Sequence, residues 1–275
     1  MAYEDYKCLQ VRLDRGVAFV VIDNPPINLF DLTLMQELDR LGRELEADDG
    51  VRVVVFSSAN PDFFIAHADI ELILTLPTEA QPRGSELGFF HAMVDRYRTM
   101  PKATMAKIEG RARGGGSEFL LSLDMRFGAI GRCLLGQPEV ALGIIPGGSG
   151  TQRLARLAGR SRALEIVLGC DDFDAITAER YGWINRALPP HQLGPFVEDL
   201  AYRVASFPAE AIALAKQSVL NADAGIVDGL LDESHLFSQA VSTADAQRRM
   251  KKSLEVGAQT REGEMELPGL YSQLG

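Results

Sequence analysis

The chain has 275 residues, of which 46% are hydrophobic and 24% charged, and its formal net charge at pH 7 is −10. This length and composition are typical of a globular protein with a sizeable buried core, built as one large domain or as a core with an appendage. The negative charge disfavours nucleic acids and anionic membranes as partners, because both are themselves negatively charged.

The beginning of the chain carries no visible export signal. Residues 1–7 are polar and acidic and lack the basic and apolar regions of a secretory signal. The first apolar run, residues 17–22, is far too short to span a membrane. The three cysteines and four histidines are scattered, which disfavours disulfides and metal sites. We therefore expect a cytoplasmic protein without a metal ion or a membrane partner.

Hydrophobic periodicity predicts an alternation of strands and helices in the first half of the chain. Residues 9–13, 17–22 and 51–56 are expected to be strands. Between the last two lies a predicted helix that Asp31 can cap. The next segments are predicted as helix, strand, helix and strand, at residues 84–100, 103–108, about 114–122 and 125–130. Such alternation indicates an α/β core.

Helices dominate the chain after Gly143. The predicted helical segments before residue 190 are 149–158, 161–168 and 177–182, followed by a short strand at 184–187. Only helical patterns follow, at about residues 193–206, 208–221, 226–241 and 243–255. We therefore divide the chain into a mixed core, residues 1–190, and an all-helical region, residues 191–275.

A glycine-rich stretch is the most informative local feature. Gly114, Gly115 and Gly116 stand where a predicted strand gives way to a short helix, and Glu118 follows within one turn. Without Cβ atoms a ligand can press against this backbone. The free N–H groups of the first helical turn carry partial positive charge suited to a developing oxyanion. The alternative is a tight turn whose acidic residue only favours the helix dipole.

Two further stretches could contribute to a site with Glu118. Glu139 stands one predicted strand later, so the chain can return and bring the two carboxylates together. The glycine-rich, apolar residues 143–150 beyond it are suited to line a cleft and start a helix. Residues 61–70 lead from aromatic to small side chains, and Asp69 can cap the helix that follows. Taken alone, Glu139 could be a solvated loop residue, and residues 61–70 an ordinary loop.

In this order, the three stretches resemble the crotonase superfamily, the enoyl-CoA hydratase/isomerase family, over about residues 9–255. Residues 114–118 look like the family's oxyanion segment with its first catalytic glutamate. Residues 136–154 look like the segment with the second catalytic glutamate. Residues 66–70 look like the loop that supplies the other oxyanion N–H group.

The resemblance implies a fold, a ligand and a set of site residues. The fold is a spiral of repeated ββα units with a C-terminal helical region that mediates trimerisation, and the trimers often pair into hexamers. The ligand is an acyl-CoA thioester, in which coenzyme A is part of the substrate, with no metal or redox cofactor. The catalytic residues are Glu118 and Glu139, and the oxyanion N–H groups belong to Ala68 and Gly115. The substrate-binding residues are Ala66, His67, Asp69, Ile70, Gly114, Pro138 and Gly147.

The presence of two glutamates favours hydration of an enoyl-CoA. Family members that only move a double bond commonly keep one carboxylate, whereas hydration needs a base for water and an acid for the α-carbon. We expect Glu118 to activate water and Glu139 to handle the α-proton. One alternative is isomerase or lyase chemistry on a polar acyl-CoA, because His67 replaces a usual glycine and Arg111 and Arg113 flank the glycine loop. Another is a non-catalytic acyl-CoA-binding protein.

Overall fold

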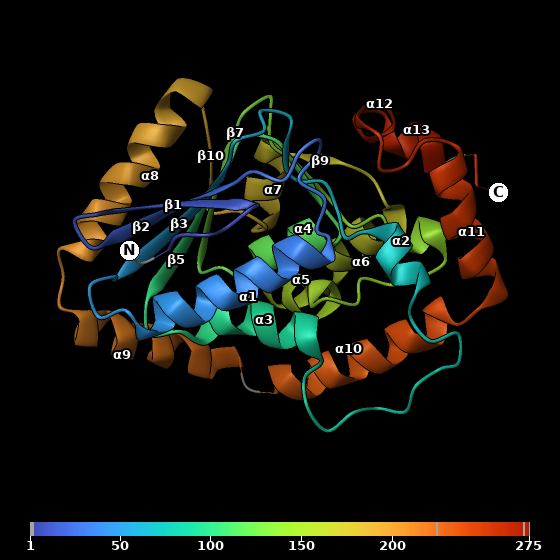
Figure 1. Cartoon of the computed structure of the whole chain (residues 1–275), viewed down its shortest axis with the longest axis horizontal. Coiled ribbons are helices and arrows are strands. Elements are labelled where there is room, and N and C mark those ends of the chain that lie inside the picture. The colour runs from blue at the N-terminus through green and yellow to red at the C-terminus, as the bar shows by residue number, and fades with distance from the viewer. Residues whose placement is uncertain (1–2, 224, 272, 275) are drawn as a thin grey trace.

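The computed structural model of the protein describes residues 3–223, 225–271 and 273–274 (Figure 1). Six strands form the larger sheet, in the spatial order β1 (Leu9–Asp14), β2 (Val17–Ile22), β3 (Val53–Ser58), β5 (Ala103–Ile108), β7 (Met125–Ala129) and β10 (Arg186–Leu188). Four short strands form the smaller sheet, in the order β4 (Phe63–Ile65), β6 (Arg111–Arg113), β8 (Leu134–Gly136) and β9 (Phe173–Asp174). The β1–β2 and β8–β9 pairs are antiparallel and the other pairs are parallel.

Helices surround both sheets. Those in the first part of the chain are α1 (Leu32–Ala47), α2 (Ile70–Leu74), α3 (Phe89–Thr99), α4 (Gly115–Leu121), α5 (Gly150–Ala158), α6 (Arg160–Gly169) and α7 (Ala175–Tyr181), with the 3₁₀ turn η1 (Glu139–Leu142). Those that follow are α8 (Pro190–Ala205), α9 (Ala209–Leu220), α10 (Ile226–Val241), α11 (Ala244–Glu255), α12 (Arg261–Met265) and α13 (Leu267–Tyr271), with the 3₁₀ turn η2 (Asn221–Asp223). Among the described residues, no helix has the length and apolarity needed to cross a bilayer.

A repeated unit builds this architecture. A strand of the larger sheet is followed by a strand of the smaller sheet and then by a helix, as in β3–β4–α2, β5–β6–α4 and β7–β8–η1–α5. Consecutive units place their strands side by side in parallel in both sheets. The expected spiral of ββα units is therefore confirmed. Because parallel strands end at the same edge of a sheet, the segments after β4, β6 and β8 meet there.

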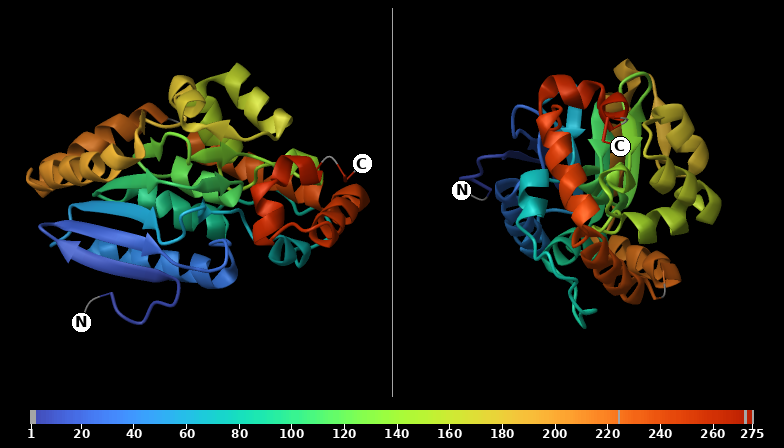
Figure 2. Two further views of the ribbon diagram at one scale, coloured as in Figure 1. Left: turned by 90° about the horizontal axis from the view of Figure 1, so that it is seen from above. Right: turned by 90° about the vertical axis from the view of Figure 1, so that its right-hand side faces the viewer.

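The larger sheet lies between two layers of helices (Figure 2). In β3, Val54 and Phe56 belong to the core shared with α1 and α3, whereas Val53 and Val55 belong to the core shared with α8. Alternate residues of a strand point to opposite faces, so an unbroken apolar strand can contact both layers. The helical region continues this packing, because α8 covers the sheet and α11 contacts α2 and η1.

The structure differs from the sequence prediction mainly in its short elements. Strands β4, β6 and β8 have three residues each, too few to display a period of two. The residues of β4 were expected to lie in a loop. The helix predicted at 84–100 begins only at Phe89, after its N-terminal cap residue, Gly88. The longer elements lie within a few residues of their predicted positions, and Asp31 caps α1 by accepting the N–H of Leu34 at 2.8 Å.

Candidate active site

Three segments meet at the edge of the smaller sheet where β4, β6 and β8 end. Ala68 follows β4, Gly115 begins the helix after β6, and Glu139 begins the turn after β8. The segments are joined by main-chain hydrogen bonds beyond the strands, since the N–H of Gly114 donates to the carbonyl of Gly136 at 3.0 Å. Residues far apart in the sequence are thereby fixed beside one another.

The main-chain amides of Ala68 and Gly115 are available as hydrogen-bond donors. Ala68 forms an isolated parallel bridge with Phe30, in which the bonds are made by the neighbouring carbonyl of His67 and N–H of Asp69, at 2.9 and 3.2 Å. In such a parallel bridge the residues before and after Ala68 make the hydrogen bonds, so the N–H of Ala68 itself points away from Phe30. Gly115 is the first residue of α4, so its N–H has no partner within the helix. Among the described residues, neither N–H has an acceptor.

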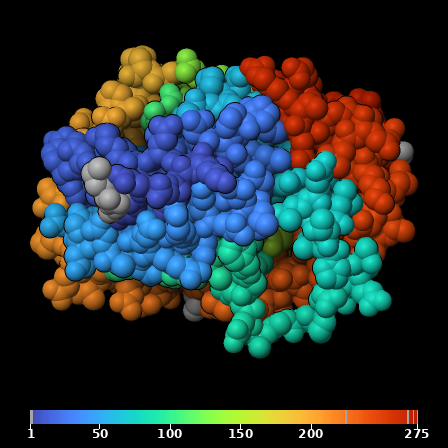
Figure 3. Space-filling model, in the orientation of Figure 1, coloured from blue at the N-terminus to red at the C-terminus, as the bar shows by residue number. Residues whose placement is uncertain are grey.

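The two residues that carry these amides line one cavity together with both predicted catalytic glutamates. The cavity has a volume of about 320 Å³ and is lined by Ala68, Gly115, Glu118 and Glu139. Its other walls are mostly apolar, formed by Leu32, Met35, Leu72, Ile73, Leu76, Phe89, Phe90, Ile144, Ile145, Gly147, Gly148 and Phe237. The molecular surface is hollowed beside the segment that carries α2, drawn in cyan (Figure 3). The arrangement suits an apolar chain attached to a polarised group.

Glu118 projects from α4 and is held by the loop that precedes α5. One of its carboxylate oxygens, Oε1, accepts the N–H groups of Gly148 and Gly150 at 2.7 and 2.8 Å. A Cβ atom on Gly148 would lie 2.5 Å from the other oxygen, so only glycine permits this approach. Burial, and then the negative charge of Glu233, raise the pKa of Glu118 to about 8, against the effect of the two N–H bonds. Glu118 can therefore exchange a proton near neutral pH.

Glu139 lies opposite the glycine loop and is also buried. Burial, and then the charge of Glu118, raise the pKa of Glu139 well above its ordinary value. In the side-chain orientation that gives both polar atoms of Gln137 a partner, its amide nitrogen donates to the two carboxylate oxygens of Glu139, at 3.1 and 3.2 Å. A Cβ atom on Gly114, where φ is 46°, would lie 2.8 Å from Oε1 of Glu139. Glycine at this position thus admits the second carboxylate to the site.

A third buried glutamate, Glu233 on α10, supports the same loop from the other side. Its carboxylate accepts three N–H groups at 2.5, 2.9 and 3.2 Å, from Ser149, Thr151 and Gln152. The N–H groups of Gly148 and Gly150 go to Glu118, so successive amides alternate between the two carboxylates. The sequence did not indicate Glu233, because its role depends on how α10 packs against α5.

Comparison with known protein families identifies the family. The sequence profile of the enoyl-CoA hydratase/isomerase family matches residues 12–262. The chain belongs to the enoyl-CoA hydratase/isomerase family. The resemblance found in the glycine loop and the two glutamate segments is thereby confirmed.

Individual members of this family match nearly the whole chain. A short-chain-enoyl-CoA hydratase of Clostridium acetobutylicum is 32% identical over 241 residues, covering 87% of this chain and 91% of the relative. A crotonyl-CoA hydratase of Syntrophomonas wolfei is 30% identical over 258 residues, covering 93% and 96%. The crystal structure of a candidate enoyl-CoA hydratase from Streptomyces avermitilis superposes with a TM-score of 0.91 at 42% identity, covering 98% and 99%.

Two of the three side chains that suggested a polar acyl group, His67 and Arg113, have partners outside the larger cavity. His67 contacts Glu264 through Nε2 at 2.9 Å and the carbonyl of Ala68 through Nδ1 at 2.8 Å. Arg113 donates two hydrogen bonds to Asp172, at 2.7 and 2.6 Å. Neither residue lines the larger cavity. Both contact buried or half-buried carboxylates, and the walls of that cavity apart from its two glutamates stay mostly apolar.

The remaining predicted site residues fall into two groups. Gly147 lines the larger cavity, whereas His67, Ile70, Gly114 and Pro138 line an adjoining cavity of about 30 Å³. Ala68, Gly115 and Glu139 line both cavities. Ala66 and Asp69, which were expected at the substrate, line neither. Ala66 accepts the N–H of Arg113 at 3.1 Å, and the carboxylate of Asp69 accepts the N–H of Glu71 at 2.9 Å, so both support the loop instead.

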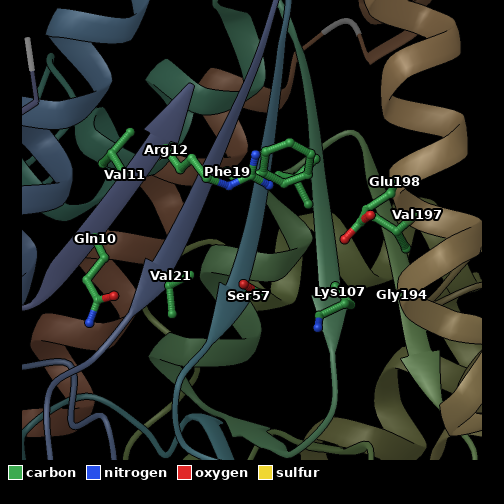
Figure 4. Close-up of a pocket in the computed structure, with 11 residues that line it drawn as sticks. Gln10, Val11, Arg12, Phe19, Val21, Ser57, Lys107, Gly194, Val197 and Glu198 are labelled. Atoms are coloured by element: carbon green, nitrogen blue, oxygen red, sulfur yellow. The ribbon is translucent and has the colours of Figure 1, made fainter. Parts of the chain in front are cut away.

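A third cavity lies apart from these two, between the larger sheet and the beginning of α8 (Figure 4). Its volume of about 430 Å³ exceeds that of either cavity beside Glu139. Both of its basic side chains are already engaged. Lys107 pairs with Glu109 at 2.6 Å, and Arg12 stacks on the ring of Phe19 with its Cζ atom 4.4 Å from the centroid. Within the described part of the chain, Glu198 is the one acidic residue in its lining. The cavity that holds Glu118 and Glu139 is therefore the candidate active site.

Proposed function

We propose that this protein is an enoyl-CoA hydratase, which adds water across the 2,3 double bond of an enoyl-CoA thioester. The observation that carries the proposal is the shared cavity, where two buried carboxylates accompany two main-chain N–H groups without acceptors. Relatives named as hydratases match this chain over most of its length. An apolar enoyl chain suits the apolar walls of the cavity.

The N–H groups of Ala68 and Gly115 stabilise the negative charge that develops on the thioester oxygen. Attack of water on the β-carbon moves electrons through the double bond onto the thioester oxygen, which forms an enolate. Donors held in place before the reaction stabilise this developing charge more than they stabilise the substrate carbonyl, and so accelerate the step. Loss of one such donor typically costs about 10² to 10³ in rate.

The two glutamates supply the proton transfers. Ionised Glu118 takes a proton from water as its oxygen bonds to the β-carbon. Protonated Glu139 then donates a proton to the α-carbon as the enolate collapses to the thioester. Turnover adds one water, and a proton returned from Glu118 to Glu139 restores the starting state. Coupled acids with raised pKa values suit this exchange, because one can be ionised while the other is protonated.

The reaction requires no electron transfer, so we expect no metal or redox cofactor, with coenzyme A entering as part of the substrate. Unchanged turnover after treatment with a chelator and gel filtration would support this expectation. We also propose a cytoplasmic homotrimer or homohexamer with an acyl-CoA as its partner. Light scattering on the purified protein distinguishes these assemblies from a monomer.

The direct test is hydration of crotonyl-CoA by the purified protein. The absorbance of the conjugated thioester should fall while 3-hydroxybutyryl-CoA accumulates. A Glu139→Gln protein purified in parallel controls for a contaminating host hydratase. Failure to hydrate any 2-enoyl-CoA in a panel of chain lengths, with isomerisation of a 3-enoyl-CoA, would replace hydratase with isomerase activity.

A further inference from the structure

Glu264 on α12 forms a buried ionic cluster behind the oxyanion site. Its side chain is fully buried, and Oε1 is 2.9 Å from Nε2 of His67. Arg113 donates to the main-chain carbonyl of Glu264 at 3.0 Å and lies 3.6 Å from its other carboxylate oxygen. Arg113 also pairs with Asp172. Two cations and two anions are thus gathered at one place.

The cluster contacts both arms of the proposed oxyanion hole. His67 directly precedes Ala68, and Arg113 directly precedes the glycine run that contains the donor Gly115. The two arms already approach closely, since a Cβ atom on Gly115 would lie 3.0 Å from that of Ala68. Because Glu264 contacts the side chain next to each arm, its position constrains the distance between the two amide donors.

The contacts of His67 favour a doubly protonated ring when Glu264 is ionised. Nδ1 faces the carbonyl of Ala68 and Nε2 faces the carboxylate of Glu264, and both partners are acceptors. A neutral imidazole has only one N–H group, so with Glu264 ionised both hydrogen bonds form only in the imidazolium. The lowered pKa of Glu264 favours that ionised form.

The charges around His67 favour that imidazolium form. Burial lowers the pKa of His67, but the charge and hydrogen bond of Glu264 and the carbonyl of Ala68 outweigh burial and raise it overall. Arg113 opposes the positive charge. Two further titratable groups, Glu139 and Tyr271, line the adjoining small cavity with His67. Asp172 and Cys170 lie with Arg113 and Tyr271 at the other end of the cluster.

We propose that Glu264 is a positioning residue of the oxyanion hole, which holds His67 as an imidazolium and, with Arg113, keeps the amides of Ala68 and Gly115 convergent on the thioester oxygen. The imidazolium also adds positive charge behind the loop that carries one of these donors. The inference rests on the proposed function. It makes α12, which lies close to the end of the chain, part of the site's support, although Glu264 lines neither cavity.

The experiment compares Glu264→Gln with Glu262→Gln, which removes the same charge from an exposed residue of the same helix. For Glu264→Gln we expect kcat on crotonyl-CoA to fall about 10- to 100-fold with KM little changed, since small displacements of donors act on the transition state. The Glu262→Gln protein should match the wild type. Glu264→Asp, which keeps the charge, should recover part of the loss.

Two spectroscopic readouts separate positioning from a purely structural role. The ¹⁵N signals of His67 should change from doubly protonated to neutral in Glu264→Gln. The ¹³C carbonyl signal of bound butyryl-CoA, which cannot be hydrated, should move toward its value in free solution. A folded Glu264→Gln protein with wild-type kcat, or with unchanged His67 and carbonyl signals, would overturn the proposal.

The same readouts keep the two proposals distinguishable. The carbonyl and His67 signals require binding but no turnover. If the wild-type protein polarises butyryl-CoA without hydrating any enoyl-CoA, the proposed function fails and the positioning role stands. If Glu264→Gln does not fold, His67→Gln decides, because it removes the imidazolium and leaves a side chain that can still donate to Glu264. An unchanged carbonyl signal in His67→Gln would contradict the inference.

Discussion

The buried pair Glu118 and Glu139 in the cavity and the buried Glu264 behind it have opposite pKa shifts. In the substrate cavity, Glu118 and Glu139 are surrounded by apolar side chains and neutral N–H donors, and burial raises the pKa of both. Behind the cavity, burial also favours protonation of Glu264. The charge and hydrogen bond of His67, the N–H of Gln259 and the charge of Arg113 outweigh burial and lower the pKa of Glu264.

The difference teaches that the partners of a buried carboxylate decide what it can do. Neutral amide donors tolerate either protonation state of Glu118, so a proton can move during the reaction. Cations hold Glu264 ionised, so it acts as a fixed negative charge. One fold thereby places acids that exchange protons beside an acid that organises structure.

The largest effect on kcat is expected from replacing one of the two carboxylic acids that exchange protons in the cavity. Glu118→Gln should lower kcat about 10² to 10⁴-fold, the usual contribution of a general base or acid. The matched control is Glu71→Gln, because Glu71 is exposed on α2 beside the cavity. Steady-state kinetics on crotonyl-CoA measures both, and equal rates for the two variants would remove Glu118 from the mechanism.

A smaller effect is expected from separating the two amide donors while leaving all acids in place. In Gly115→Ala the new methyl group meets Cβ of Ala68 at 3.0 Å and presses the arms apart. We expect kcat to fall about 10- to 100-fold, as for other small misplacements. Gly194→Ala on α8, where an added methyl group meets nothing within 4 Å, should retain full activity. A fully active Gly115→Ala enzyme would argue against a donor at residue 115.

Removing the third glutamate should change the pH profile more than the maximal rate. The charge of Glu233 contributes to the raised pKa of Glu118, so Glu233→Gln should lower that pKa. The limb of the kcat–pH profile governed by Glu118 should therefore move to lower pH. Asp232→Asn is the control, because this neighbouring carboxylate pairs with Arg83 at the surface. Identical profiles for both variants would exclude electrostatic coupling between Glu233 and Glu118.

The smallest effects should appear in stability, with opposite signs for the two groups. Glu118 has a raised pKa in the folded state, so its contribution to stability is lost as pH rises from 4.5 to about 8. Glu264 has a lowered pKa, so its contribution is lost as pH falls below 4.5. Denaturant titrations of the wild type, Glu118→Gln and Glu264→Gln across pH measure both slopes. Slopes of the same sign would contradict the assigned protonation states.

The sequence predicts the long elements and the catalytic pair, but not the short strands or the buried glutamates that support the site. The long elements carry clear periodicity, and the motifs around Glu118 and Glu139 indicate the catalytic pair through family resemblance. The three-residue strands of the smaller sheet show no periodicity, although they bring these motifs together. Glu233 and Glu264 act on partners 84 and 197 residues away along the chain, and only tertiary packing brings them there. His67 and Arg113 stand out in the sequence as departures from the family pattern, but nothing in the sequence points to Glu264 as their common partner.

The most direct test of the central claim is a double-mutant cycle on kcat with Glu118→Gln, Glu139→Gln and the combined variant. If both carboxylates serve one substrate in one cavity, the double variant should lose little more activity than the more impaired single variant, because residues acting as a unit are strongly non-additive. Losses that multiply in the double variant, or a single variant with full activity, would contradict the shared site.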